Sequence, residues 1–503
     1  MKKSWIMLII IFFIIAGIRI YFAFQTDQFS VDEAYLTLRQ VEHIVENGTP
    51  LYVDDLSFGG RVYVFLPLFH YLLALFTKIL PIIFAAKILP NILASTIVFF
   101  VYMLVYDITK DEHISIFTSI FSAFIPIYFS KTINSISIYS LVVPLIVLLL
   151  YLVMNIDKGY NIKYFLVAIL IFLLTHTSVI ILILSLLVYI ILVKIENIKL
   201  KRSIVEATLF SAFLMLWLYL IIFKKAFLTH GFSLVWQNMP QKYLITYFHQ
   251  IPIWEGIYLI GIIPFVLGLF IIYHYLFNLK NRKVYLLISF AITVTCLLWL
   301  KLINLDFALI CLGVILVILF GIAYNHLNQY IKTTRFSWIE RPLFILICII
   351  FVFTSMIPSV ILAEDTMAKS LPYSHVQTMI KLSRVIPENI STTRIASSLN
   401  EGHAVAYFTK KKNFGDNNFI FMKDADEIVN DIDELYSTVS KIKASEILNK
   451  YKIEYVMFTP LVAEEYNTDK LRFVDDECFD MIIDDNINIY KNKCVVIKSI
   501  MSG

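Results

Sequence analysis

The sequence predicts a polytopic α-helical membrane protein followed by a C-terminal α/β domain. Of the 503 residues, 59% are hydrophobic and 16% are charged, whereas a soluble protein of this length needs more polar surface. Apolar stretches long enough to cross about 30 Å of hydrocarbon recur from Trp5 to about Leu362. Residues 364–503 contain no such stretch and are rich in Lys, Asp, Glu and Asn. We therefore expect a membrane domain over residues 1–363 and a soluble domain over residues 364–503.

The first apolar segment, about Ile6 to Phe24, is interpreted as a retained span rather than a signal peptide. It is longer than the apolar part of a signal peptide, and it ends in bulky aromatic residues instead of a small-residue cleavage site. Lys2 and Lys3 precede this segment, which places the N-terminus in the cytoplasm under the positive-inside rule.

Three later basic loops are also expected in the cytoplasm, and they set the path of the chain. These loops are Lys194–Arg202, Lys280–Lys283 and the stretch from Lys332 to Arg341. Between them lie two pairs of spans that each enclose an outside loop, namely 204–223 with 257–277 and 284–300 with 305–324. A last span at 343–362 carries the C-terminal domain to the outer side of the membrane.

Two apolar segments have alternative interpretations. Segment 65–80 is short, so it either spans the membrane or lies there as an interfacial or re-entrant helix. Segment 164–194 is either one long helix or two helices broken at Thr175–Ser178. We favour the interfacial or re-entrant helix and the broken pair, which together give about eleven spans and place Ser130–Ser137 outside.

The C-terminal domain shows alternating patterns of helix and strand. Residues 442–450 are expected to form a helix, and residues 453–458 the buried strand that follows it. Further strands are expected at 419–422, 481–483 and 487–490.

Two cysteines, Cys478 and Cys494, flank the last two of these strands. A hairpin there brings the two residues opposite each other, and they are the only cysteines of the C-terminal domain. We expect a disulfide, because a domain outside the cytosol faces a compartment in which such bonds persist. Two unpaired thiols are the alternative if the host is anaerobic.

Asp32 and Glu33 lie just beyond the first span, in an external loop that covers residues 25–87. Carboxylates beside hydrocarbon are energetically costly, and they are usually found there with a charged or polar partner or with a function. Residues 32–46 have the pattern of an amphipathic interfacial helix that ends near Asn47-Gly48. At its N-terminus the helix dipole favours an ionised carboxylate, as a general base requires. The structural alternative is that Asp32 only caps this helix.

Three motifs in the first ~140 residues occur in an order that resembles a known superfamily. They are Asp32-Glu33-Ala34-Tyr35, the Pro-Leu-rich segment Leu66–Leu75, and Tyr128-Phe129-Ser130-Lys131 followed by Tyr139-Ser140-Leu141. The sequence thereby resembles the GT-C glycosyltransferases, which use polyprenyl-phosphate-linked sugars. These include protein O-mannosyltransferases, aminoarabinose transferases of lipid A and oligosaccharyltransferase catalytic subunits. Lys131 stands where the family commonly has Arg.

The resemblance implies transfer of a hexosyl or pentosyl group from a polyprenyl phosphate or diphosphate. The acceptor would be a protein, lipid or glycan at the outer face of the cell membrane, and no nucleic acid is expected as a partner. Asp32 would be the general base, with Glu33 as a supporting acid. The other candidates, all for substrate binding, are Tyr35, Asp54, Asp55, Arg61, Lys131, Lys224 and Lys225.

The four cations among these candidates would stabilise the negative charge of the leaving phosphate. Each has a structural alternative. Arg61 completes a turn, Lys131 is solvated in its loop, and Lys224 and Lys225 snorkel at a helix end.

No cofactor is assigned from the sequence, and a divalent metal is left open. The oligosaccharyltransferase branch places a further acid in its second external loop for a metal, and residues 130–137 contain none. This departure favours the branches that transfer single sugars. His176, His230 and His249 lack a helical His-x-x-x-His spacing and are interpreted as polar interfacial residues.

Three other functions stay open at this point. They are a transporter, a polysaccharide polymerase or ligase, and a non-catalytic scaffold of the cell envelope. Transporters commonly show repeated halves and charges near the membrane midplane, whereas charges gather here in the outside loops.

Overall fold

The computed structural model describes residues 2–248, 250–335, 337–386, 393–422, 424–484 and 487–494, and the chain divides into two compact units. The first, called the helical unit, comprises Met1–Thr26, Leu66–Ile222 and Tyr247–Lys369. The second, called the α/β unit, comprises Asp27–Phe65, Phe223–Thr246 and Ser370–Gly503. Most of the first external loop therefore groups with the C-terminal residues. The division into domains at residue 363 stays a prediction.

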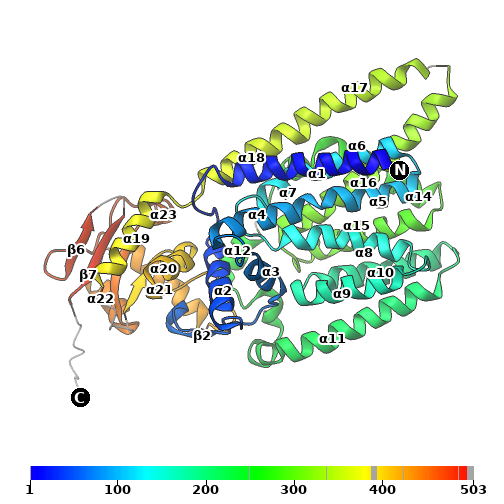
Figure 1. Ribbon diagram of the computed structural model, residues 1–503. Helices are drawn as coiled ribbons and strands as arrows, with labels where there is room; N and C mark the ends of the chain where they lie inside the picture. Colours follow the sequence, from blue (N-terminus) through cyan, green and yellow to red (C-terminus); the bar gives the residue numbers. More distant parts are fainter. Residues whose placement is uncertain are drawn as a thin grey trace. The chain divides into compact units, whose positions relative to one another are not determined.

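The helical unit consists of apolar helices, many of which lie side by side (Figure 1). Its helices are α1 (Lys2–Ala23), α3 (Leu68–Phe76), α4 (Ile82–Ser95), α5 (Ile97–Thr109), α6 (Glu112–Ala123), α7 (Pro126–Lys131), α8 (Tyr139–Met154), α9 (Asn161–Thr175), α10 (Val179–Ile195), α11 (Arg202–His230, of which the last turns belong to the α/β unit), α13 (Ile253–Ile260), α14 (Ile262–Phe277), α15 (Arg282–Trp299), α16 (Leu305–Thr333), α17 (Glu340–Phe351) and α18 (Ile357–Ala368). Six helical segments among the described residues are long and apolar enough to cross a membrane, and a bent pair makes a seventh. The predicted polytopic helical fold is confirmed, whereas the number of eleven spans stays a prediction.

Both ambiguous segments of the sequence form short helices. α3 has 9 residues, and at 1.5 Å per residue it extends about 14 Å, roughly half of the hydrocarbon thickness. The break predicted near residue 176 is confirmed, because α9 ends at Thr175 and α10 begins at Val179.

The span expected at 257–277 falls on two helices, and whether they cross the membrane as one span stays a prediction. The chain is bent there by 99° between α13 and α14. Gly261 lies at the bend with a φ of +102°, a conformation that L side chains rarely adopt. Pro264 follows in the first turn of α14, where its missing N–H costs no intrahelical hydrogen bond. The bend in this segment therefore depends on backbone conformation, which hydropathy does not report.

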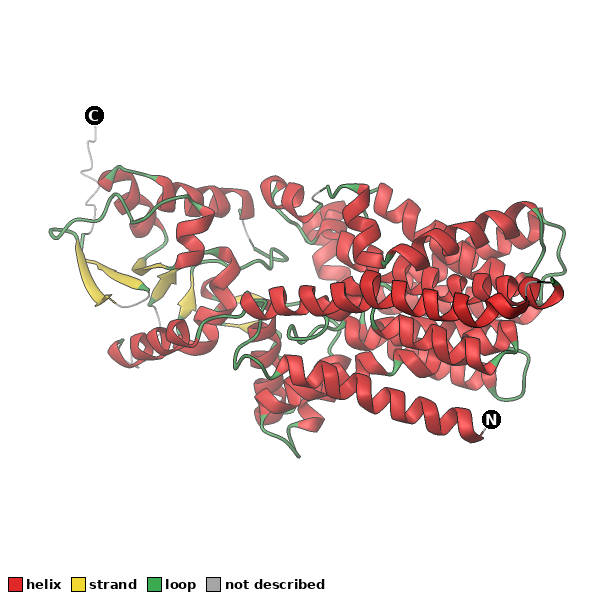
Figure 2. Cartoon of the chain, turned by 90° about the horizontal axis from the view of Figure 1, so that it is seen from above, coloured by secondary structure: helices red, strands yellow, loops and turns green. Residues whose placement is uncertain are grey.

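The α/β unit is built on a five-stranded mixed sheet, seen among the yellow strands of Figure 2. Its elements are α2 (Glu33–Asn47), β1 (Val53–Asp54), β2 (Arg61–Val62), α12 (Gln241–Tyr247), α19 (Tyr373–Val385), β3 (Arg394–Ala396), α20 (Gly402–Thr409), β4 (Lys412–Asn413), α21 (Ala425–Ser437), α22 (Lys441–Lys450), β5 (Ile453–Phe458), α23 (Pro460–Glu465), β6 (Phe479–Asp484) and β7 (Asn488–Asn492). The strand order is β4-β3-β5-β7-β6. β3 is parallel to β4 and β5, whereas β7 is antiparallel to β5 and β6.

Most of the local patterns in the C-terminal domain are confirmed. The predicted helix at 442–450 is α22, the strand at 453–458 is β5, and the hairpin is β6–β7. The strand predicted at 419–422 is wrong. There the N–H of Met422 donates to the carbonyl of Phe419 at 3.1 Å, and Phe421 has a φ of +60°, so the segment is a turn. Its apolar pattern arises because Phe419 and Met422 are buried in the core.

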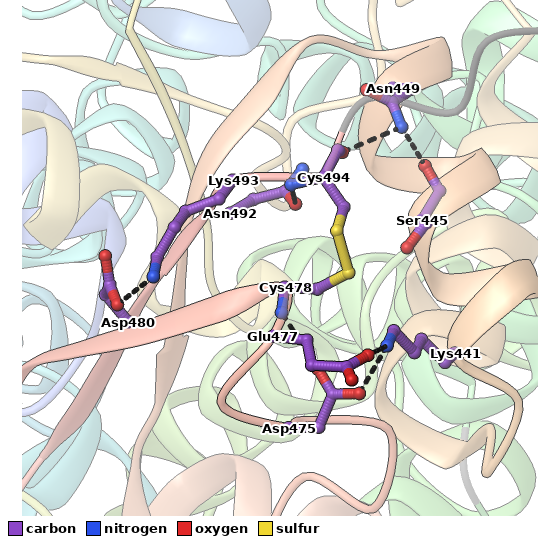
Figure 3. Close-up of a disulfide and its surroundings, with 10 residues drawn as sticks. All are labelled: Lys441, Ser445, Asn449, Asp475, Glu477, Cys478, Asp480, Asn492, Lys493 and Cys494. Atoms are coloured by element: carbon purple, nitrogen blue, oxygen red, sulfur yellow. Dashed lines mark hydrogen bonds and ion pairs between the residues drawn. A yellow bond between two sulfur atoms is a disulfide. The ribbon is translucent and has the colours of Figure 1, made fainter.

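The predicted disulfide between Cys478 and Cys494 is confirmed (Figure 3). The two Cα atoms lie 4.9 Å apart, within the range that a disulfide requires. The N–H of Lys493 also donates to the carbonyl of Cys478 at 2.8 Å. The covalent bond therefore closes the open end of the β6–β7 hairpin.

The first external loop is part of the α/β unit through contacts between segments far apart in sequence. The N–H of Asn413 donates to the carbonyl of Leu56 at 2.9 Å, and the N–H of Phe58 donates to the side-chain oxygen of Asn413. Phe58 also packs against the apolar core of the unit. The loop thereby pairs with the segment around β4.

Candidate functional site

Asp32 lies immediately before α2, the amphipathic helix that the sequence predicts. α2 ends at Asn47, and Gly48 follows with a φ of +76°, as expected for a glycine terminator. Asp32 does not cap α2 with its side chain. Instead, its Oδ2 accepts the N–H of His403 at 2.9 Å, and its Oδ1 accepts the N–H of Ala404 at 2.8 Å. Both donors belong to the first turn of α20, so the carboxylate binds the N-terminus of a different helix from the one expected.

The environment of Asp32 changes its protonation equilibrium. The residue is half-buried. Burial raises the pKa of Asp32 well above its ordinary value, and the charges of Glu33 and Asp416 raise it further, although the two backbone N–H groups lower it. The sequence argument considered only the dipole of α2 and therefore expected the opposite direction. Burial thus favours the protonated form of this carboxyl group, whereas the two N–H groups favour the ionised form.

Glu33 and Tyr35 occupy very different environments. Glu33 is exposed, and its Oε1 accepts a hydrogen bond from Nδ2 of Asn417 at 2.6 Å. The ring of Tyr35 is buried against Tyr407 and Phe408 of α20, with ring centroids 5.8 and 5.2 Å away. Tyr35 thus packs α2 against α20, and its role as a substrate contact stays a prediction.

Arg61 is buried in an ion pair with Asp416. Its guanidinium also donates to the hydroxyl groups of Ser57 and Tyr63, each at 3.0 Å, and to the carbonyl of Asn418. Burial raises the pKa of Asp416, but the charge of Arg61, the interaction with His403 and the hydrogen bonds from Ser57 and Asn418 together outweigh it, so this pKa lies below its ordinary value. The guanidinium that was a candidate for binding phosphate is therefore surrounded by protein acceptors.

The two aspartates of the same loop differ in exposure. Asp54 is buried, forms an ion pair with Arg39 of α2, and accepts the N–H of Leu56 at 3.0 Å. Asp55 is exposed. Of the two, only Asp55 presents its side chain to solvent.

The three candidate lysines lie in two different units. In the helical unit, Lys131 is exposed and pairs with Asp306 at the start of α16 at 2.5 Å. In the α/β unit, Lys224 and Lys225 are exposed on α11, and Nζ of Lys225 lies 5.5 Å from the centroid of the Phe421 ring.

The sequence interpretation missed the C-terminal residues that meet the first external loop, above all His403, Asp416 and Asn417. Each is one polar residue in a polar domain, and no motif marks it. His403 is fully buried, and neither ring nitrogen has a hydrogen-bond partner among the described residues. Its Nε2 lies 3.8 Å from Oδ1 of Asp416, and burial lowers the pKa of His403, which favours the neutral ring.

The described residues do not fit a metal held by protein ligands. No three His, Cys, Asp or Glu side chains in that part of the chain gather in a way that could hold an ion. Nδ1 of His176 lies 2.8 Å from the Ser178 hydroxyl, and Nε2 of His230 accepts the N–H of Phe421 at 3.2 Å. His249 lies outside the described residues. No chemical step is therefore assigned to a metal.

Solved structures with the same fold include an archaeal oligosaccharyltransferase and a bacterial protein, ArnT. The oligosaccharyltransferase AglB of Archaeoglobus fulgidus matches 91% of this chain and 70% of its own, with a TM-score of 0.70 and 12% identity. A second structure of AglB, in complex with an inhibitory peptide and a dolichol-phosphate, matches with a TM-score of 0.68 and 13% identity, over 91% of this chain and 69% of its own. ArnT of Cupriavidus metallidurans bound to undecaprenyl phosphate matches over 99% of both chains, with a TM-score of 0.54 and 11% identity.

Sequence comparison adds nothing to this result, because no protein-family model and no curated protein matches the chain. At 11–13% identity the structural likeness establishes the fold. The likeness extends over 91% of this chain for AglB and 99% for ArnT. This protein has the fold of AglB and ArnT, which is the GT-C fold.

Proposed function

We propose that this protein transfers a sugar from a polyprenyl phosphate or diphosphate to a protein, lipid or glycan acceptor at the outer face of the cell membrane. The observation that carries the proposal is the GT-C fold over at least nine tenths of the chain. It is shared with AglB, whose structure contains a dolichol-phosphate, and with ArnT, whose structure contains undecaprenyl phosphate. Both structures contain a polyprenyl phosphate, so the lipid class of the donor is the part of the proposal with the strongest support.

Asp32 is the proposed general base. An acceptor hydroxyl is a weak nucleophile at neutral pH, and a positioned carboxylate that takes its proton typically accelerates transfer by about 10²–10⁴-fold. Each carboxylate oxygen of Asp32 accepts one backbone N–H and retains a second lone pair for the acceptor. Glu33, exposed on the same turn, is the proposed supporting acid.

The negative charge that develops on the leaving phosphate requires cationic partners. Lys131, Lys224 and Lys225 are exposed and stay candidates for this role. Arg61 is left out of the proposed donor site, because its guanidinium is buried and paired with Asp416.

The experiment uses the purified full-length protein with a polar-lipid extract of the producing cells as the donor source and the cell-envelope fraction of the same cells as the acceptor source. Mass spectrometry follows the disappearance of lipid-linked sugars and the appearance of free polyprenyl phosphates. Asp32→Asn is expected to reduce the rate by at least about a hundredfold, because the base is lost. Asp27→Asn is the matched control, since Asp27 is an exposed acid five positions earlier in the same loop.

The possible outcomes distinguish a wrong function from a wrong assignment of Asp32 as the base. A wild-type rate in Asp32→Asn would remove Asp32 from the mechanism while leaving the transferase activity intact. If the wild-type protein consumes no lipid-linked sugar, the proposed transferase function is wrong. A transporter or an envelope scaffold would then be the better interpretation, since neither cleaves a sugar–phosphate bond.

A further inference from the structure

The first turn of α20 presents two backbone donors to one carboxylate. The N–H groups of His403 and Ala404 have no partner within the helix, because the first N–H groups of a helix never do. They point to the two different oxygens of Asp32, at 2.9 and 2.8 Å. The helix dipole adds to the attraction, since anions are stabilised at helix N-termini. The orientation of the Asp32 carboxylate is therefore set by α20.

The position of α20 itself is fixed by a close contact at its first residue. A Cβ atom on Gly402 would lie 2.1 Å from the carbonyl oxygen of Gly415 and 2.8 Å from Cβ of Asp416. No side chain fits there without displacing backbone. Asn413 also donates from Nδ2 to the carbonyl of Gly402 at 2.9 Å. The start of α20 thus lies directly against the segment 413–416.

That same segment is bound to the loop that carries Asp32. Asp416 forms the buried ion pair with Arg61, and Asn417 donates to the side chain of Glu33. The loop therefore contacts segment 402–418 at both ends, through Asp32 and Glu33 at one and through Arg61 at the other. The two N–H donors cannot shift relative to Asp32 without disturbing these contacts.

We propose that the first turn of α20, residues Gly402–Ala404, is the positioning element of the Asp32 base, so that the proposed carboxylate is oriented by the C-terminal part of the chain. The inference rests on the proposed function, because it assigns a partner to the same base. The physical reason is preorganisation: fixed N–H dipoles hold the carboxylate in one orientation before the acceptor binds. Gly402, His403 and Ala404 act through Asp32 and are positioning residues.

The pH dependence of the reaction reports on this contact. The titratable groups that interact with Asp32 are Glu33 and Tyr35 on α2, His403 on α20, and Asp416. The two N–H bonds favour the ionised carboxylate, so their loss raises the pKa of Asp32 further. The acidic limb of the pH–rate profile then moves to higher pH.

The test compares Gly402→Ala with Gly17→Ala in the lipid-extract assay described above. Gly402→Ala pushes the first turn of α20 away from segment 415–416, whereas a Cβ on Gly17 in α1 meets no atom within 4 Å. We expect kcat to fall by about tenfold or more in Gly402→Ala, because the Asp32 carboxylate loses its orientation. The KM for the lipid donor should change by less than about twofold, because the substitution does not alter donor binding. The acidic limb moves to higher pH only in Gly402→Ala.

A double-mutant cycle separates positioning from general damage. In an Asp32→Ala background Gly402→Ala is expected to cause no further loss, since the group through which it acts is absent. A further loss of the same size in that background would overturn the inference, as would a wild-type rate and pH profile in Gly402→Ala.

A second variant keeps the inference testable if Gly402→Ala fails to fold. Ala404→Pro removes one N–H donor in the first helical turn, where proline is tolerated because this N–H has no intrahelical partner. Thermal unfolding confirms that each variant is folded, and the same loss of kcat and shift in pH profile are expected. Wild-type behaviour of a folded Ala404→Pro overturns the inference alone. Absence of lipid-linked sugar consumption by the wild-type protein overturns both the inference and the proposed function.

Discussion

Arg61 and Asp416 form a buried ion pair although 355 positions separate them in the chain. Their side chains are 3% and 0% exposed. Asp416 accepts further hydrogen bonds from the Ser57 hydroxyl and from Nδ2 of Asn413, the latter at 3.2 Å. Two charges removed from water are stable only while both are present, so this pair makes the first external loop and the C-terminal residues interdependent.

Arg61→Ala is expected to destabilise the α/β unit strongly. The substitution leaves the Asp416 carboxylate buried without its cation, which typically costs about 3–5 kcal/mol. Thermal unfolding of the purified protein measures the effect. Lys410→Ala is the matched control, because it breaks the exposed pair with Glu42, worth at most about 1 kcal/mol. Equal small losses of stability in both variants would show that the buried ion pair does not stabilise the α/β unit.

The buried carboxyl group of Glu401 gives a pH-dependent contribution to stability. Burial raises the pKa of Glu401 to about 7, and the charge of Glu465 adds to the effect, although the hydrogen bond from Thr459 opposes it. Because the folded state holds this proton more tightly than the unfolded state, stability is greatest below about pH 4.5 and is lost as the pH rises to about 7.

Glu401→Gln tests the direction of this pH dependence of stability. The neutral amide does not titrate, so the variant should lack this pH dependence and gain stability relative to the wild type between pH 5 and pH 8, by up to about 3 kcal/mol. Thermal unfolding across that range measures the difference. A constant difference between the two proteins at every pH would contradict the assignment.

The disulfide is expected to stabilise the β6–β7 hairpin. Replacing both Cys478 and Cys494 by Ser removes a cross-link over 16 positions, which costs about 3 kcal/mol in the chain-entropy model. Mass spectrometry of the non-reduced protein detects the bond directly, and thermal unfolding measures the loss. Free thiols at both positions in protein purified without reductant would refute the bond.

The membrane topology is testable with an impermeant thiol reagent on intact cells. The background replaces the free cysteines Cys296, Cys311 and Cys348 by Ala. A cysteine at Ser135 is expected to react from outside and one at Lys199 to be protected, because basic loops stay in the cytoplasm. Labelling at Lys199 would reverse the orientation of the whole chain. Protection at Ser135 alone would instead favour a membrane-spanning segment 65–80.

The sequence by itself determined the elements that depend on residues close together in the chain. The apolar periodicity of 442–450 and 453–458 predicted α22 and β5, and the spacing of Cys478 and Cys494 around two short strands predicted the hairpin and its disulfide. Hydropathy predicted the membrane helices, and Asn47-Gly48 predicted the end of α2. In each case the residues that cause the structure are neighbours in the chain.

Tertiary structure alone decided how Asp32 is held and what Arg61 does. Their partners, the first turn of α20 and Asp416, lie more than 350 positions away, and no sequence pattern connects them. The alternative that Asp32 caps its own helix was wrong, because its carboxylate accepts N–H groups of α20 instead. The turn at 419–422 and the bend at Gly261 depend on positive φ angles, which composition does not report. Burial then reversed the expected direction of the Asp32 pKa shift, because the loss of water around a carboxylate outweighs a helix dipole.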